Sequence, residues 1–164
     1  MLKYTNCQVT FSEVPDEISL AINISNCPYH CPDCHSKELW EDVGQKLSAG
    51  TLVDLMTTNK GVTCICFMGG DSDLDELYNL FKFIPMLFKG IKIAWYTGRN
   101  DIPKDLPPID YIKIGPYKAE CGPLNNPNTN QRFYTKGSSM NKMDANSHMW
   151  YDTTDKFWRN DTNS

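Results

Sequence analysis

Short apolar runs alternate with polar turns along the chain, and their spacing predicts a series of strands. Residues 17–25 place aliphatic side chains on one face with a period of two, as a half-buried strand does. Residues 62–68 are continuously apolar, which is typical of a parallel strand covered on both faces. Two more runs predict strands over 91–96 and 109–114. The first dozen residues alternate more loosely and predict an edge strand or a hairpin.

Helical spacing occupies the segments between these strands. Apolar residues predict a helix over 51–59 and another from Ser72, with a kink or an end near Pro85 because proline lacks an N–H. Strand and helix in alternation predict an α/β fold with a parallel sheet. Four such strands are too few for a closed eight-stranded barrel. We therefore expect an open, partial (β/α) barrel with a mostly parallel, curved sheet.

The 164 residues are expected to form a single domain, 1–164, with a distinct C-terminal part. Residues 117–131 form a polar loop rich in Asn and Pro that is too long for a simple connection. The tail predicts a hairpin between 132–134 and 149–151, and a short helix near 154–159. We expect 117–164 to cover the site or to contact a partner.

Charge, hydrophobicity and cysteine content make several classes of function and location less well supported. The formal net charge is −4 and there is no basic run, so binding to nucleic acid or to an anionic membrane has little support. No apolar segment approaches the roughly 20 residues that span a bilayer, and the N-terminus lacks a secretory pattern. A reducing cytoplasm is the expected location, where seven cysteines act as thiols or metal ligands instead of disulfides.

Three of those cysteines, Cys27, Cys31 and Cys34, lie directly after the first predicted strand with the spacing C-x3-C-x2-C. Crowded thiolates repel one another unless a proton or a metal neutralises them. A closed zinc site usually has four ligands, whereas three thiolates on a four-iron cluster leave one iron open. Pro28 and Pro32 disfavour a helix, so the loop is expected to wrap and bring the three sulfur atoms together.

Two other interpretations of this loop stay open on spacing alone. One is a zinc site completed by His30, His35 or a distant cysteine, and the other is a set of unpaired structural thiols. Cys64 and Cys66 share one face of a predicted strand and are best explained as buried small side chains. Cys7 and Cys121 have no partner by spacing.

The sequence CPYHCPDCHSKELW at 27–40 resembles the cysteine loop of the radical S-adenosylmethionine (SAM) superfamily, and within it the glycyl-radical-enzyme activases. The strand 62–68 runs into Gly-Gly-Asp, as in that superfamily, and the sequence TNQRFY at 129–134 resembles a C-terminal stretch of one family. That family is the anaerobic ribonucleoside-triphosphate reductase-activating proteins. The resemblance covers residues 8 to 160.

This resemblance implies a chemistry and a set of cofactors. Cys27, Cys31 and Cys34 would each bind one iron of a [4Fe–4S] cluster, and SAM would chelate the fourth iron. An electron from the cluster would release methionine and a 5′-deoxyadenosyl radical, which takes a hydrogen atom from a glycine of the large catalytic subunit of the reductase. A small flavodoxin- or ferredoxin-like protein would supply the electron. Activation of another glycyl radical enzyme is the alternative among enzymes; a structural zinc-binding interaction module and a small electron-transfer protein are the alternatives from other classes.

The same resemblance implies which residues contact the cofactors. The Asp71 carboxylate would hold the SAM ammonium. On its own the Gly-Gly-Asp turn is better explained by a cap that Asp71 or Ser72 provides to the next helix, whereas beside the cysteine loop the ligand role is favoured, and one residue could do both. Three positions depart from the usual pattern: Asp33 stands where many relatives have an aromatic residue, Ser36 replaces a common asparagine, and Lys113 replaces a small or acidic residue. The implied SAM-binding set is Asp33, Cys34, His35, Gly69, Gly70, Asp71, Tyr96, Thr97 and Gly98.

Overall fold

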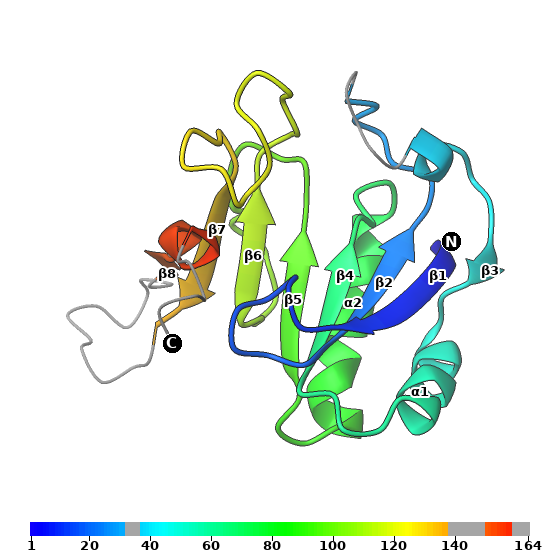
Figure 1. The fold of residues 1–164 in the computed structure, drawn as a ribbon. Helices are drawn as coiled ribbons and strands as arrows, with labels where there is room; N and C mark the ends of the chain where they lie inside the picture. The colour runs from blue at the N-terminus through cyan, green and yellow to red at the C-terminus, as the bar shows by residue number, and fades with distance from the viewer. Residues whose placement is uncertain (32–36, 138–149, 159–164) are drawn as a thin grey trace.

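The computed structural model describes residues 1–31, 37–137 and 150–158, and within these residues eight strands form one open sheet (Figure 1). The strand order is β3-β1-β2-β4-β5-β6-β7-β8. The strands are β1 (Lys3–Thr10), β2 (Ser19–Ile24), β3 (Gln45–Lys46), β4 (Cys64–Met68), β5 (Lys92–Tyr96), β6 (Tyr111–Ile114), β7 (Arg132–Lys136) and β8 (Trp150–Asp152). The helices are α1 (Ala49–Thr58) and α2 (Leu74–Leu87), with 3-10 turns η1 (Lys37–Trp40) and η3 (Thr154–Phe157).

The four strands at the centre of the sheet are the four that the apolar runs predict. β2, β4, β5 and β6 pair in parallel and in chain order, so their arrowheads point the same way in Figure 1. The flanking pairs, β1 with β2 and β3 and β7 with β6 and β8, are antiparallel. The expectation of a mostly parallel sheet is therefore correct for the centre only, and the whole sheet is mixed.

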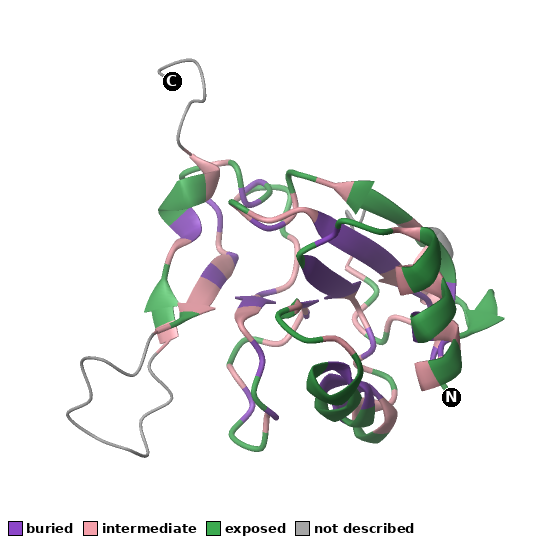
Figure 2. Ribbon diagram, turned by 90° about the horizontal axis from the view of Figure 1, so that it is seen from below, coloured by how far each residue is buried: buried purple, intermediate pink, exposed green. Residues whose placement is uncertain are grey.

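Both helices cover one face of the sheet, and the main core lies beneath them (Figures 1 and 2). The large side chains that alternate along the parallel strands point to this side and pack against the apolar stripe of α2. They are Leu20, Ile22 and Ile24 of β2, Ile65 and Phe67 of β4, Ile93 and Trp95 of β5, and Ile112 of β6.

The opposite face of the sheet carries small side chains. Ala21, Cys64, Cys66 and Ala94 are buried there, beneath Val14 of the β1–β2 loop and under Leu124 and Phe133. Burial raises the pKa of the Cys64 thiol to about 12, and that of Cys66 rises well above its ordinary value for the same reason. Both are therefore protonated packing residues, as the sequence indicates. The small side chains on this face let Val14, Leu124 and Phe133 pack closely onto the sheet.

Several element ends differ from the predicted ones for local reasons. α1 begins at Ala49 because the Ser48 hydroxyl caps it by accepting the Thr51 N–H (3.2 Å). α2 continues past Pro85 to Leu87, since a proline so near the C-terminus removes only one late hydrogen bond. Neither α-helix in the described part of the chain is long and apolar enough to cross a membrane.

The predictions for the tail are confirmed in outline. β7 pairs with β8 as the expected hairpin, and η3 is the expected short helix, although as a 3-10 turn. Met149 and Arg159, the outer limits of those predictions, lie outside the described residues.

Candidate functional site

The cysteine loop leaves the carboxyl end of β2, and backbone geometry directs N–H groups at its first sulfur. Asn26 and His30 have positive φ values of 60° and 44°, so the chain curls around Cys27. The backbone N–H groups of Tyr29 and His30 donate hydrogen bonds to the Cys27 sulfur. Burial nevertheless keeps the pKa of Cys27 above its ordinary value, and these two hydrogen bonds oppose that shift. A bound cation would complete the stabilisation of the thiolate.

The turn η1 anchors this loop from the other side. The Cys27 N–H donates to the Leu39 carbonyl (2.9 Å). The His30 ring stacks on Trp40, with ring centroids 4.7 Å apart, and the Lys37 ammonium lies 5.7 Å from the Trp40 ring centroid. The Trp in the motif is thus a packing partner of the loop.

A cavity of about 160 Å³ opens beside the loop, where the carboxyl ends of the parallel strands meet. It brings together Cys27, Cys31 and most of the residues that the resemblance implies. These are Gly69, Asp71, Tyr96, Thr97 and Gly98. Gly70 is not among the residues that line it and packs against Leu77 of α2 instead. The remaining predicted residues, Asp33, Cys34 and His35, lie outside the described part of the chain.

Asp71 is the acidic side chain of this cavity. Thr97 Oγ1 (2.5 Å) and the Tyr29 hydroxyl (3.2 Å) both donate to its Oδ1 atom. Burial raises the pKa of Asp71, against the effects of these hydrogen bonds and of the Lys113 and Arg99 charges. The helix cap that Asp71 or Ser72 was expected to provide comes from Asp73, whose side chain accepts the Glu76 N–H (3.2 Å). The alternative role as a helix cap is therefore wrong by one or two residues, and Asp71 faces the cavity.

Glycines at the strand ends allow two close approaches. A Cβ atom on Gly98 would lie 2.8 Å from the Tyr29 ring, so the ring packs where only glycine fits. Gly69 has a φ of 112°, and its carbonyl accepts the Trp95 indole N–H (2.9 Å). One lone pair of that carbonyl is thus used inside the fold.

Two side chains without an assigned role complete the wall of the cavity. The Lys113 ammonium donates to the carbonyls of Thr97 (3.0 Å) and Gly115 (3.1 Å), and the Gln131 amide donates to Gly115 (3.3 Å). Asn130 donates to the Pro116 carbonyl (2.9 Å). The sequence did offer a signal for Lys113. It follows Ile112 on a predicted strand, and because side chains alternate between the two faces of a strand, Lys113 must face away from the main core. Gln131 had no signal apart from the resemblance.

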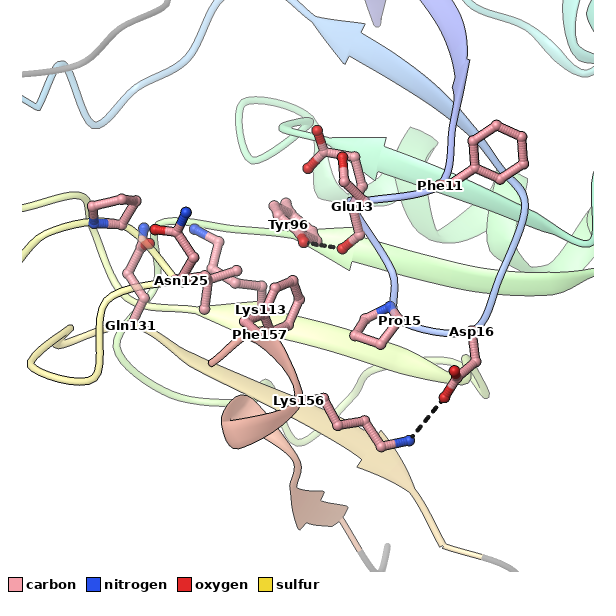
Figure 3. A pocket seen from close by; sticks show the side chains of 13 residues that line it. Phe11, Glu13, Pro15, Asp16, Tyr96, Lys113, Asn125, Gln131, Lys156 and Phe157 are labelled. Atoms are coloured by element: carbon pink, nitrogen blue, oxygen red, sulfur yellow. Dashed lines mark hydrogen bonds and ion pairs between the residues drawn. The ribbon is translucent and has the colours of Figure 1, made fainter. Parts of the chain in front are cut away.

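A second, larger cavity of about 790 Å³ lies between the β1–β2 loop, the ends of β5 and β6, the 117–131 loop and η3 (Figure 3). Tyr96, Lys113 and Gln131 line both cavities and so form the wall between them. The Tyr96 hydroxyl donates to the Glu13 carbonyl, and Asp16 and Lys156 form an exposed ion pair (3.3 Å). The β1–β2 loop and the tail thereby meet over this cavity.

Comparisons of the chain with protein-family models, with curated proteins and with solved structures found no match. The donor chemistry itself suits an iron–sulfur cluster: two thiols of the motif line one cavity, and backbone N–H groups are directed at one of them. Within the described residues no three His, Cys, Asp or Glu side chains are grouped as metal ligands, and Cys34 is not among those residues.

Proposed function

We propose that this protein is a radical SAM activase that generates a glycyl radical on the large catalytic subunit of anaerobic ribonucleoside-triphosphate reductase. One observation supports this most directly. Cys27 and Cys31 share a cavity with Asp71 and Thr97 at the carboxyl ends of three adjacent parallel strands. In this proposal the open sheet is a partial barrel of the radical SAM type.

Cys27, Cys31 and Cys34 would hold a [4Fe–4S] cluster, which when bound supplies the electron for reductive cleavage of SAM and so for hydrogen abstraction from the partner's glycine. Asp71 would bind the ammonium of SAM, because it is a desolvated carboxylate whose hydrogen-bond partners are hydroxyl groups. Thr97 orients that carboxylate. Tyr96 and Gly98 form the adjoining wall, next to Tyr29.

The larger cavity is the place proposed for the glycine-bearing segment of the partner. Its volume is within the range of ligand cavities, and its wall is shared with the smaller cavity. We further propose a cytoplasmic location and a flavodoxin- or ferredoxin-like electron donor, since a cluster with an open iron requires reducing conditions.

Metal analysis tests the first step. Protein purified and reconstituted without oxygen is expected to be brown and to contain about four iron and four sulfide per chain. A colourless protein that holds one tightly bound zinc would contradict the proposal and support a structural zinc module.

Product analysis tests the second step. The reduced protein with SAM is expected to yield 5′-deoxyadenosine, and addition of the reductase is expected to give a glycyl radical signal by electron paramagnetic resonance. SAM cleavage without that signal would mean that the partner is a different glycyl radical enzyme.

A further inference from the structure

A buried ammonium group lies in the wall between the two cavities. Lys113 is 8% exposed, and its Nζ atom donates to the carbonyls of Thr97 (3.0 Å) and Gly115 (3.1 Å). It also lies 5.6 Å from the centroid of the Tyr96 ring. None of the ion pairs between described residues includes Lys113. Backbone carbonyls and an aromatic face are therefore the direct contacts of this charge, and the Asp71 carboxylate acts on it without a direct ion pair.

Lys113 lines the same cavity as Cys27, Cys31 and Asp71. Burial lowers the pKa of Lys113 to about 8, and the negative charges of Asp71, Cys31 and Cys27 oppose this shift. Charges interact more strongly in a desolvated cavity than in water. A change of charge at the cysteines therefore changes the electrostatic energy of the Lys113 ammonium. The Lys113 charge changes the energy of the cysteine site by the same interaction.

We propose that Lys113 is a positioning residue that supplies a fixed positive charge to the cysteine site and thereby raises the reduction potential of the cluster held there. This inference rests on the proposed function. One electron from the donor protein makes a cluster with three thiolate ligands more negative. A buried cation stabilises that reduced form more than the oxidised form.

A purely structural role for Lys113 has a different signature, because its ammonium also ties the turn after β5 to the turn after β6. Three variants separate charge from hydrogen bonding. Lys113→Gln keeps an N–H donor and removes the charge, Lys113→Met removes both, and Lys113→Arg keeps the charge. Lys92→Gln is the matched control, because Lys92 is exposed and begins β5, at the end of the strand away from Thr97 and the cavity.

The measurement is a redox titration of the reconstituted cluster without SAM, followed by electron paramagnetic resonance. At a fixed potential, the oxidised-to-reduced ratio is expected to rise roughly threefold or more in Lys113→Gln and Lys113→Met. Lys113→Arg and Lys92→Gln are expected to match the wild type. A shifted potential in Lys113→Met but not in Lys113→Gln would show that only the hydrogen bonds between the two turns matter, and it would overturn the inference. A wild-type potential in Lys113→Gln overturns it for the same reason.

The wild-type control separates this inference from the function on which it rests. If the wild type binds no iron and sulfide, the proposed function fails and the inference fails with it. If the clusters load and their potentials agree, only the inference fails.

A variant that does not retain a cluster is tested as apoprotein. The alkylation rates of Cys27 and Cys31 are measured by peptide mass spectrometry, with Cys121 as the internal reference. Loss of the cation is expected to slow alkylation of Cys27 and Cys31 roughly threefold. Equal rates in the wild type and Lys113→Gln would overturn the inference.

Discussion

At the scale of single residues, the site is defined by charges that are buried without a close partner of opposite sign. Asp71 accepts hydrogen bonds from two hydroxyl groups, and Lys113 donates to two backbone carbonyls. Burying a charge in this way lowers stability. If these groups are retained for a ligand, as proposed, stability and binding should respond in opposite directions to their removal.

The first prediction concerns Asp71→Asn. The free energy of unfolding at about pH 7 is expected to equal or exceed that of the wild type, because the neutral amide still accepts both hydrogen bonds without burying a charge. The affinity of the loaded protein for SAM is expected to fall roughly tenfold or more, since the ammonium loses a charged partner. Urea denaturation and calorimetry measure the two effects. Asp54→Asn, on the exposed side of α1, serves as the control. Unchanged SAM affinity in Asp71→Asn would contradict the assigned role.

The second prediction is a pH dependence of stability. Burial lowers the pKa of Lys113 from 10.5 to about 8, so the unfolded chain holds this proton more tightly than the folded one. The cost of burying the charge is fully present below about pH 8 and is relieved as the pH rises towards about 10.5. The wild type is therefore expected to gain about 3 kcal/mol relative to Lys113→Met between those limits. Urea denaturation of reduced apoprotein at about pH 7 and about pH 10 measures this difference. A difference that stays constant would contradict it.

At the scale of elements, the central strands of the sheet were predictable because their sequences are uninterrupted or strictly alternating apolar runs, as is typical of buried strands. β3 was not, since Gln45 and Lys46 are two exposed polar residues that pair with β1 without any pattern of their own. The antiparallel addition of β7 to β6 also had no signal, because pairing partners depend on how the loop 117–131 returns.

The site was predictable to the extent that its residues follow those strands. Parallel strands bring their carboxyl ends to one edge, which explains why Asp71 and Thr97 lie near Cys27. The helix cap at Asp73 and the cavity wall at Lys113 and Gln131 depend on backbone turns and tertiary contacts. A one-residue shift in a turn changes these contacts without changing any apolar pattern.

The third prediction separates cysteines on the loop from those on a strand. Cys27→Ala, Cys31→Ala and Cys34→Ala are each expected to lose the iron and sulfide, because each would remove one of three ligands. Cys64→Ala is expected to retain them and to lose only about 1 kcal/mol of unfolding free energy, since Cys64 is fully buried in β4. Metal analysis and urea denaturation measure the two quantities. Loss of iron in Cys64→Ala alone would show that the ligand set is wrong.

The fourth prediction concerns the turn after β5. In Gly98→Ala the new Cβ atom would lie 2.8 Å from the Tyr29 ring, so the ring must shift, and its hydrogen bond to Asp71 is disturbed. The expected loss of unfolding free energy is about 1–3 kcal/mol, together with weaker SAM binding. Gly50→Ala in the first turn of α1 is the control, because its nearest contact would be 3.8 Å away. Helix propensity makes that substitution neutral or stabilising by up to about 1 kcal/mol. Equal stabilities of the two variants would contradict the close packing at Gly98.

At the scale of the whole molecule, two cavities share one wall, and different parts of the chain build them. The cysteine loop, the strand ends, Tyr117 and Gln131 line the smaller cavity, whereas the β1–β2 loop, residues 123–125 and η3 line only the larger one (Figure 3). If the smaller cavity cleaves SAM and the larger one receives the partner's segment, the two activities should be separable by substitution.

The fifth prediction tests this division with Phe157→Ala. Phe157 lines the larger cavity and packs edge-on against Phe133, with ring centroids 5.0 Å apart, and it is not among the residues that line the smaller cavity. Cluster content and SAM cleavage in the absence of the partner are expected to match the wild type. The yield of glycyl radical on the reductase is expected to fall roughly tenfold, because the wall that would position the partner's segment is lost.

Two controls show whether the effect of Phe157→Ala comes only from loss of an aromatic side chain or from unfolding. Phe83→Ala removes the same kind of side chain from the exposed surface of α2 and is expected to leave both activities unchanged. Thermal unfolding should show that Phe157→Ala remains folded, since loss of a partly buried aromatic lowers stability by a few kcal/mol at most. If SAM cleavage without the partner falls in the same proportion as the radical yield, SAM cleavage and partner binding are not assigned to separate cavities. The larger cavity would then act on the cofactor rather than on the partner, because its wall through Tyr96, Lys113 and Gln131 is the route by which a change at Phe157 reaches the cysteine site.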